Sequence, residues 1–407
     1  MDKMADVPVN EKRWLVVIAG LLIIVCLGVA YAWGIFLLPI SKEFGWTRAS
    51  VSLAVSILLL TFSLFMAVGG LCEKKIGPGK TATAGGILVC AGWILASFTK
   101  SLPWLYMTYG VLTGIGTGLS YLPAISTGIK WFPDRKGLVT GIIIFGFGFG
   151  SAFLAPAGTK LIINYGWRTT MLIYGIVFGT VISASSFFLK VPPKNWMPDS
   201  IKNGTFACTK NVDLTPSQML REKSFKFIFL TYFIAMVAGM MAIGHIIPFL
   251  TDSGYTAMQA AFAITILALF NGLGRISGGA LSDRIGTGNT LVSLFIIIGT
   301  TVLLLNFMPS LFLIYVAAGI TGLCFGGFLS VYPAITCDYF GLKNFGINYG
   351  LVFIGYGMGC FAGPWLGGMV HDATGNYMIA FMTAGITALI GGATAFLYLK
   401  KNNRGKQ

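Results

Sequence analysis

Twelve long apolar runs follow one another along this 407-residue chain, and each is long enough to cross a lipid bilayer as a helix. A helix that crosses the hydrocarbon core needs about 20 mostly apolar residues. The runs are continuous, whereas the strands of a membrane β-barrel alternate between apolar and polar positions. The sequence therefore predicts an all-α membrane protein with twelve transmembrane helices. These are expected at roughly 14–40, 49–72, 81–99, 103–130, 137–163, 168–190, 225–250, 259–282, 290–308, 309–337, 345–370 and 374–399.

The charges are few and unevenly placed. Only 10 % of the residues are charged, and the net charge is +15, whereas soluble domains carry about 25 % charged residues. With both termini inside, the predicted cytoplasmic segments hold 22 of the 28 Lys and Arg residues and the external segments hold five. This is the positive-inside pattern of membrane proteins, so the positive charge does not indicate nucleic-acid binding. We expect a multi-pass protein of the cell (inner) membrane with cytoplasmic termini.

An internal repeat divides the chain. A polar stretch at 191–224 separates residues 1–190 from residues 225–407, and each part holds six runs. Residues 69–79 align with residues 278–288 at a shift of 209, which also maps Pro39 onto Pro248 and five glycines of the fifth run onto five of the eleventh. Parallel repeats of six spans are a plan of secondary transporters, which bind substrate near the midplane between the repeats.

Several motifs resemble those of the major facilitator superfamily. The segment Gly279-x-x-x-Asp283-Arg284-x-Gly286 resembles its loop signature between the second and third spans of each half. Residues 131–138 (WFPDRKGL) resemble the start of the fifth span in monocarboxylate transporters and oxalate:formate antiporters, and residues 348–350 (NYG) and 31–33 (YAW) fit the same branch. The resemblance covers essentially the whole chain and implies two pseudo-symmetric halves of six helices.

The loop signature joins an acid and a base at the cytoplasmic ends of two helices. Asp283 and Arg284 form it in the second half, while the first half has Lys74 at the Asp position and Glu73 one place earlier. We expect Asp283, Arg284, Glu73 and Arg135 to gate the protein by latching the halves in one conformation. The alternative is that Asp283 and Arg284 only anchor the topology.

One charge lies inside the membrane. Arg275 falls near the middle of the eighth run, while all thirteen acids fall in loops or at the ends of runs. An arginine at this depth costs at least about 2.5–3.5 kcal/mol on insertion scales, and it does not lose its proton. We therefore expect Arg275 to bind a substrate carboxylate, with Asn271 on the same helical face. The alternative is an arginine that bonds backbone carbonyls or reaches toward the cytoplasmic surface.

Other candidate residues line the same expected pathway. His245 precedes Pro248 in the seventh run, and we expect it on the pathway; a structural histidine with a carbonyl partner is the alternative. Aromatic residues near the middle of the runs are expected to contact substrate, although aromatic side chains more often serve packing. These are Tyr31, Tyr121, Phe145, Tyr332, Phe353 and Tyr356.

Two departures from the resembling families bear on the substrate. Animal monocarboxylate transporters carry an Asp where Asn271 stands, and a Lys in the first span that this chain lacks. Oxalate:formate antiporters carry a Lys where Tyr356 stands. A dicarboxylate favours two cations, so the single Arg275 favours one carboxylate, as in L-lactate or pyruvate. By resemblance, transport is expected to be proton-coupled symport, with His245 as the titrating residue.

Other function classes fit less well. An anion exchanger of the oxalate:formate type is the main alternative, followed by an exporter of amphiphilic anions. A channel would need repeated polar rings along a pore, and a membrane enzyme would need clustered catalytic groups. The chain has two His, and its seven Cys show no paired spacing. We expect a monomeric carrier that needs no metal and no cofactor.

Overall fold

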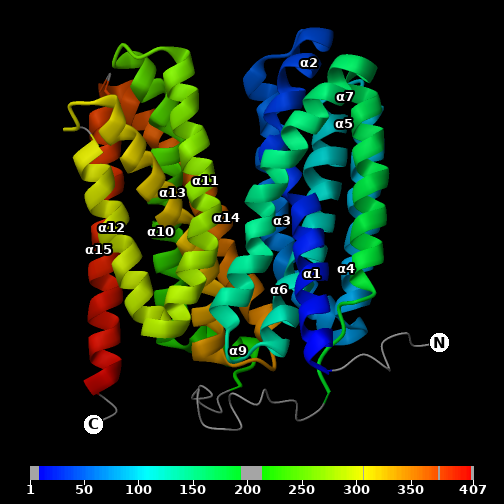
Figure 1. The fold of residues 1–407 in the computed structure, drawn as a ribbon, viewed down its shortest axis with the longest axis vertical. Coiled ribbons are helices and arrows are strands. Elements are labelled where there is room, and N and C mark those ends of the chain that lie inside the picture. Colours follow the sequence, from blue (N-terminus) through cyan, green and yellow to red (C-terminus); the bar gives the residue numbers. More distant parts are fainter. Residues whose placement is uncertain (1–8, 194–212, 306, 375, 405–407) are drawn as a thin grey trace. The chain divides into compact units, whose positions relative to one another are not determined.

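The computed structural model describes residues 9–193, 213–305, 307–374 and 376–404, and all regular elements in these ranges are helices (Figure 1). In chain order they are α1 (Val9–Leu27), η1 (Gly28–Ala32), α2 (Gly34–Phe44), α3 (Arg48–Ile76), α4 (Pro78–Ser97), α5 (Leu102–Leu105), η2 (Tyr106–Leu112), α6 (Thr113–Trp131), α7 (Lys136–Ser186), α9 (Pro216–Arg221), α10 (Lys223–Asp252), α11 (Ala257–Ile285), α12 (Thr287–Leu305), α13 (Leu311–Phe340), α14 (Phe345–Thr374) and α15 (Tyr377–Arg404).

The predicted spans are found in these helices. Ten helical stretches of the described chain are long and apolar enough to cross a membrane. One of them is the 51-residue helix α7, which bends at Gly166 (φ 78°, ψ 162°) and so contains both the fifth and the sixth predicted run. The fourth predicted run is built from α5, the π-helical segment η2 and α6. The prediction of an all-α membrane protein is confirmed, and this division accounts for twelve spans.

The chain forms two compact units. Unit 1 contains Met1–Asp134, Ile142–Thr209 and Leu342–Leu351, and unit 2 contains Arg135–Gly141, Lys210–Gly341 and Val352–Gln407. Each unit therefore combines most of one sequence repeat with a short segment of the other, seven residues at the start of α7 or ten around the start of α14. Of the predicted linker at 191–224, residues 194–212 lie outside the described part of the chain.

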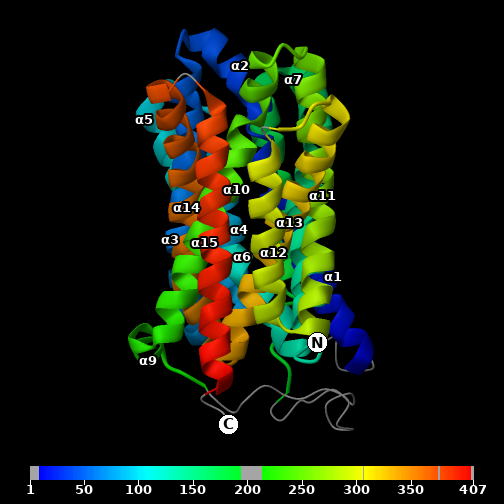
Figure 2. The same cartoon turned by 90° about the vertical axis from the view of Figure 1, so that its left-hand side faces the viewer.

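Each unit is a bundle around one central helix. In unit 1, α6 packs against α1, α3 and α4. In unit 2, α13 packs against α11 and α12, and α15 runs beside α12, as both views show (Figure 2). The helix α11 begins with a capping box, in which Gln259 N–H donates to Thr256 Oγ1 at 3.3 Å and Thr256 N–H donates to Gln259 Oε1 at 2.9 Å. Such caps satisfy the first amides of a helix.

The internal repeat is visible in the turns. Gly45 (φ 68°) and Gly254 (φ 86°) follow α2 and α10, and Gly77 and Gly286 (both φ 88°) join α3 to α4 and α11 to α12. Each pair is separated by the shift of 209 found in the sequence. A left-handed backbone is accessible to glycine at little cost, which explains why glycine ends these helices in both repeats.

Candidate functional site

Arg275 lies in α11 and is almost completely enclosed. Its side chain is 1 % exposed, and its Nε donates a hydrogen bond of 3.1 Å to Oδ1 of Asn271, one helical turn earlier. The two residues that the sequence placed on one helical face are therefore in direct contact. The bond to Asn271 fixes the plane of the guanidinium group inside unit 2.

Glycines hold the backbone of this helix on two sides. A Cβ at Gly141 of α7 would collide with the carbonyl oxygen of Arg275, and a Cβ at Gly326 of α13 would collide with the carbonyl oxygen of Asn271. The same Cβ at Gly326 would lie 3.0 Å from the backbone nitrogen of Arg275. Small residues let membrane helices approach this closely. The position of Arg275 is thus set by backbone-to-backbone packing.

Unit 1 contains the same crossing without the polar side chains. A Cβ at Gly118 of α6 would lie 2.9 Å from the carbonyl oxygen of Phe62 and 3.0 Å from the nitrogen of Met66. The repeat aligns Phe62 with Asn271 and Met66 with Arg275, and both apolar side chains are buried. The fold therefore repeats this helix contact, whereas the polar pair Asn271 and Arg275 is replaced by Phe62 and Met66 in unit 1.

Three of the predicted aromatic residues form one cluster in unit 2. The ring of Tyr332 stacks on Tyr232 at a centroid distance of 3.8 Å, and Phe353 stacks on Tyr356 at 4.3 Å. Tyr232 also lies 6.1 Å from Phe353 and 6.0 Å from Tyr356. The sequence analysis did not select Tyr232, because one tyrosine within the seventh apolar run carries no distinguishing signal.

The other predicted aromatic residues, Tyr31, Tyr121 and Phe145, belong to unit 1. In unit 1, the ring of Tyr121 lies 5.0 Å from Phe62 and 6.0 Å from Phe147, in edge-to-face geometry. Phe145 stacks on Phe149 at 5.6 Å. The backbone of Tyr31 belongs to η1, but its side chain is outside the described part of the structure.

His245 is bonded to a backbone carbonyl. Its Nε2 lies 3.0 Å from the carbonyl oxygen of Pro364 in α14, and its buried Nδ1 has no hydrogen-bond partner among the described residues. A carbonyl accepts only, so Nε2 carries the proton that it shares with Pro364. The ring also lies 5.2 Å from Tyr377, against which His371 stacks at 4.0 Å. Both histidines of the chain therefore pack against one tyrosine.

Asp283 caps a neighbouring helix. Its Oδ1 accepts the backbone N–H of Gly137 at 2.9 Å, and its Oδ2 accepts that of Leu138 at 2.8 Å. These are amides in the first turn of α7, where a helix has no acceptors of its own and carries partial positive charge. A Cβ at Gly279 would collide with the carbonyl of Gly137. Gly279 thus allows α11 to approach the start of α7, where Asp283 accepts the two backbone hydrogen bonds.

A lysine that the sequence analysis did not select completes this network. Lys136 forms an ion pair with Asp338, whose Oδ2 accepts the hydroxyl of Thr287 at 2.7 Å. The side chains of Arg135 and Arg284, which the sequence analysis expected to gate the protein, are exposed. Lys136 therefore supplies an acid-paired cation at this end of unit 2. No short-range motif marks it, since its partner is 202 residues away.

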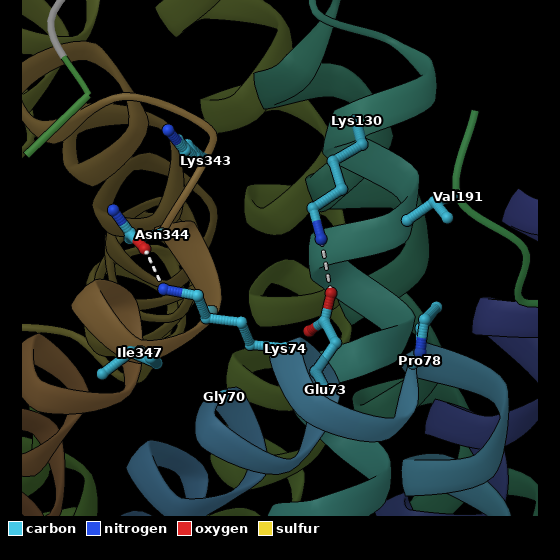
Figure 3. Close-up of a pocket in the computed structure, with 11 residues that line it drawn as sticks. Gly70, Glu73, Lys74, Pro78, Lys130, Val191, Lys343, Asn344 and Ile347 are labelled. Atoms are coloured by element: carbon cyan, nitrogen blue, oxygen red, sulfur yellow. Dashed lines mark hydrogen bonds and ion pairs between the residues drawn. The ribbon is translucent and has the colours of Figure 1, made fainter. Parts of the chain in front are cut away.

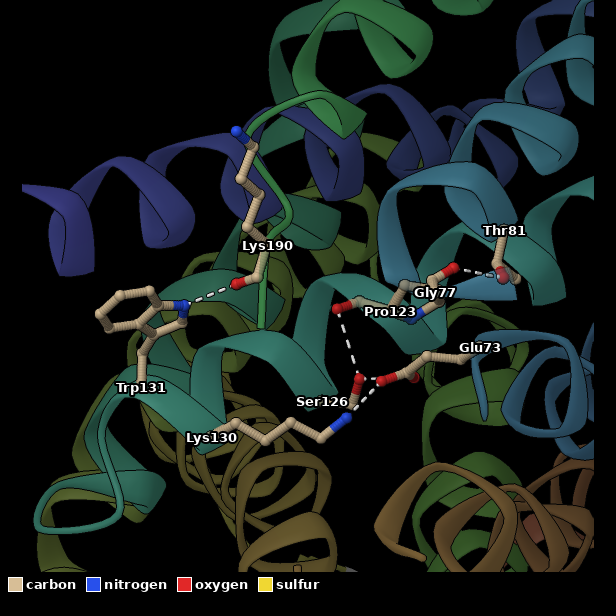
Figure 4. Close-up of polar contacts among 8 residues, drawn as sticks. All are labelled: Glu73, Gly77, Thr81, Pro123, Ser126, Lys130, Trp131 and Lys190. Atoms are coloured by element: carbon tan, nitrogen blue, oxygen red, sulfur yellow. Dashed lines mark hydrogen bonds and ion pairs between the residues drawn. The ribbon is translucent and has the colours of Figure 1, made fainter. Parts of the chain in front are cut away.

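In unit 1 the paired acid is Glu73, one place before Lys74, which is the residue that aligns with Asp283. The Glu73 carboxylate accepts the hydroxyl of Ser126 at 2.6 Å and pairs with Nζ of Lys130 at 2.5 Å (Figure 4). The next residue, Lys74, donates to Oδ1 of Asn344 at 3.1 Å (Figure 3). A Cβ at Gly70 would collide with the backbone at Gly346, which repeats the crossing of Gly279 and Gly137 at the shift of 209.

Comparison with known proteins assigns the chain to one protein family. The sequence profile of the Major Facilitator Superfamily matches residues 18–310 and 228–407. The oxalate:formate antiporter of Oxalobacter formigenes is 27 % identical over 399 residues, which cover 97 % of this chain and 93 % of that protein. Monocarboxylate transporter 12 of Xenopus laevis is 27 % identical over 418 residues, with coverage of 96 % and 90 %.

A bacterial relative and a solved structure agree with this assignment. YhjX of Escherichia coli K12, described as an uncharacterized MFS-type transporter, is 28 % identical over 354 residues, 86 % of each chain. A crystal structure of the E. coli fucose:proton symporter has the same fold, with a TM-score of 0.71, 16 % identity, and coverage of 94 % of this chain and 98 % of that one. These proteins are transporters and not enzymes, and the resemblance drawn from the motifs is confirmed. The chain belongs to the Major Facilitator Superfamily.

Proposed function

We propose that this protein is a secondary active transporter of small monocarboxylates, such as L-lactate or pyruvate, that works by alternating access. The observation that carries the proposal is the burial of Arg275, which is 1 % exposed. An arginine that reached toward a membrane surface would be exposed. Ionisable groups within membrane spans are costly and most often mark substrate or ion pathways. We infer that the substrate carboxylate binds this guanidinium group.

The chemistry of the site favours a carboxylate. The guanidinium group is planar and presents paired N–H donors, which match the two oxygens of a carboxylate. The hydrogen bond from Nε to Asn271 orients this plane. In the proposed mechanism Asn271 is a positioning residue, and the charge that recognises the anion belongs to Arg275.

A single carboxylate is favoured over two. Tyr356 stacks on Phe353 and adjoins Tyr232, so this position contributes to an aromatic cluster and provides no second cation. We propose that Tyr332, Phe353 and Tyr356 contact the apolar part of the substrate, and that Tyr31, Tyr121 and Phe145 do so from unit 1. Anion exchange is the alternative function, because one of the relatives is an oxalate:formate antiporter.

We propose proton-coupled symport, with His245 as the proton-binding residue. The coupling is supported by the chemistry of His, which titrates near neutral pH, and by the free lone pair that the Nε2–H tautomer leaves on Nδ1. Protonation of Nδ1 would create a buried N–H, which needs an acceptor. A substrate oxygen would supply one, and this would couple proton and anion binding.

The proposal also includes the residues that gate the protein and its orientation in the membrane. Asp283 and Glu73, together with the exposed Arg284 and Arg135, are proposed to stabilise one conformation of the transport cycle. We place both termini in the cytoplasm, the protein in the cell (inner) membrane as a monomer, and the boundary between the repeats at 191–224.

The test is uptake of labelled lactate by proteoliposomes. An inward proton gradient without internal anion should drive accumulation by the wild-type protein. Arg275→Lys keeps the charge but loses the paired donors, so it should lose most uptake. Substantial uptake by folded Arg275→Ala would refute the anion site. Stimulation by internal lactate, with no response to the proton gradient, would instead identify an exchanger.

A further inference from the structure

A small cavity lies between the helices of unit 1. Residues from the end of α1 and from η1, α3, α4, η2 and α6 line it, and all of these elements belong to unit 1. The space that the centre of a water molecule can occupy in it is about 10 Å³. One buried water needs about 10–15 Å³ on this measure. The cavity therefore has the size of a single water molecule and is far too small for a carboxylate substrate.

Two hydrogen-bond donors that line this cavity have no protein acceptor. Trp93 of α4 is 1 % exposed and Tyr109 of η2 is 0 % exposed. Neither the indole Nε1–H nor the phenol hydroxyl has a hydrogen-bond partner among the described residues. The two rings are in edge-to-face contact, with centroids 5.1 Å apart. Buried polar groups are normally bonded to protein or to ordered water, so these two donors indicate a partner other than the described chain.

Two threonines of α6 supply acceptors to the same cavity. The hydroxyl of Thr113 donates to the carbonyl oxygen of Thr108 at 3.3 Å, and the hydroxyl of Thr117 donates to that of Thr113 at 2.8 Å. Both threonines line the cavity. A hydroxyl group has one proton and two lone pairs, so each oxygen can still accept a hydrogen bond after its proton is used. The lining thus combines two donors with two acceptors.

The internal repeat offers a comparison. The shift of 209 aligns α4 with α12, and the matching contacts of Gly118 and Gly326 align α6 with α13. The residues of unit 2 that correspond to Trp93, Tyr109 and Thr117 are apolar and buried; in the same order, they are Val302, Ala317 and Phe325. Donors and acceptor are therefore replaced together in the other repeat, which is expected if all of them serve one shared partner.

We propose that this cavity binds one water molecule, held by Trp93, Tyr109, Thr113 and Thr117. The water accepts the protons of the indole and the phenol, and it donates its own two protons to the threonine hydroxyls. Buried waters typically make about three hydrogen bonds and are costly to remove. This water joins α4 to η2 and α6 beside the point where the first span changes from α1 to η1. The proposal does not depend on the transported substrate, because Arg275 does not line the cavity.

Thermal unfolding of the full-length protein tests the proposal. Tyr109→Phe keeps the ring that contacts Trp93 and removes only the hydroxyl. If water is bound, the variant loses one of its hydrogen bonds, and Tm should fall by about 2 °C or more. If no water is bound, the variant only removes an unsatisfied buried hydroxyl, and Tm should stay the same or rise.

The control for this measurement is Tyr165→Phe. Tyr165 is exposed and does not line the cavity, so its variant reports the general effect of removing a phenol hydroxyl. A Tm of Tyr109→Phe that is equal to or higher than that of Tyr165→Phe would overturn the proposal.

A crystal structure that resolves ordered water measures the site directly. We expect one density peak within hydrogen-bond distance of both Nε1 of Trp93 and the hydroxyl of Tyr109. Thr117→Val should weaken or remove this peak. Thr170→Val is the control and should keep it, because the buried Thr170 makes the equivalent bond to the carbonyl of Gly166, at 2.9 Å, and does not line the cavity. A wild-type map that shows other buried waters but no peak at this position would overturn the proposal.

Discussion

The guanidinium Nε of Arg275 donates to the side-chain oxygen of Asn271 at 3.1 Å. The acceptor is neutral, so it orients the cation without cancelling its charge. A carboxylate in the same place would form an ion pair with the guanidinium group and would compete with a substrate anion for its charge. The identity of residue 271 should therefore control how strongly Arg275 attracts a substrate anion.

We predict that Asn271→Asp weakens lactate binding more than Asn271→Leu does. The leucine variant loses the orienting hydrogen bond, worth about 1.5–3 kcal/mol for a bond to a charged group. The aspartate variant also places a negative charge beside the cation. Isothermal titration of purified protein with lactate measures both effects. Wild-type affinity in Asn271→Asp would contradict the assigned role of Arg275.

Glycine packing around Arg275 gives a prediction about stability. Gly141→Ala would force a Cβ into the carbonyl of Arg275, and overpacking of this kind costs about 1–3 kcal/mol. Gly148→Ala is the control in the same helix, because a Cβ there meets nothing within 4 Å. We expect a lower Tm for Gly141→Ala only. Equal melting temperatures for the two variants would show that the close crossing is absent.

The cap that Asp283 forms on α7 can be tested by amide exchange. Asp283→Ala leaves the amides of Gly137 and Leu138 without this acceptor, a loss of about 0.5–2 kcal/mol by comparison with helix caps. Asp283→Asn keeps one carbonyl oxygen and should lie between wild type and Ala. Hydrogen–deuterium exchange of the peptide that begins at Lys136 should accelerate in the same order. Unchanged exchange in Asp283→Ala would rule out the cap.

Selectivity is expected to depend on Tyr356. Oxalate should compete poorly with labelled lactate in the wild type, and Tyr356→Lys should improve its competition by supplying a second cation. Tyr356→Phe serves as the control, because it keeps the stacking on Phe353. A wild-type preference for oxalate would favour the exchanger.

Proton coupling is expected to require His245. Glutamine can still donate to the carbonyl of Pro364, but it binds no proton near neutral pH. His245→Gln should therefore lose gradient-driven accumulation while it keeps lactate exchange between the two sides of the membrane. If the proton gradient drives lactate accumulation equally well by the variant and by the wild type, the proposal of symport is retained and the assignment of proton binding to His245 is wrong.

The helices could be predicted closely because the bilayer fixes their length. The fifth run was expected to begin at 137 and the structure begins α7 at 136; the eleventh was expected at 345 and α14 begins there. The repeat could also be predicted, because the glycines that end the helices in both halves are a local signal in the sequence. The π-helical turn at Tyr106–Leu112 carries no such signal, because it changes hydrogen bonding and leaves the apolar pattern intact.

Contacts between distant side chains were less predictable. The signature motif drew attention to Asp283 and Arg284, but it gave no sign of the ion pair between Lys136 and Asp338. The contact of Arg275 with Asn271 was accessible because helical periodicity decides it. The aromatic cluster around Tyr232 could not be predicted, because it depends on which faces of α10, α13 and α14 pack together. Tertiary packing decides which helix faces are in contact, and this cannot be inferred from a single sequence.

The crossings at Gly70 with Gly346 and at Gly137 with Gly279 bring backbone against backbone. Ordering a long side chain costs up to about 2 kcal/mol of rotamer entropy, whereas glycine has no rotamers to lose. A helix crossing of this kind can separate and re-form without repacking of side chains. We therefore expect that, if these helices move in the transport cycle, the hydrogen bonds of Asp283 and of the Lys74–Asn344 pair are the side-chain contacts that must break.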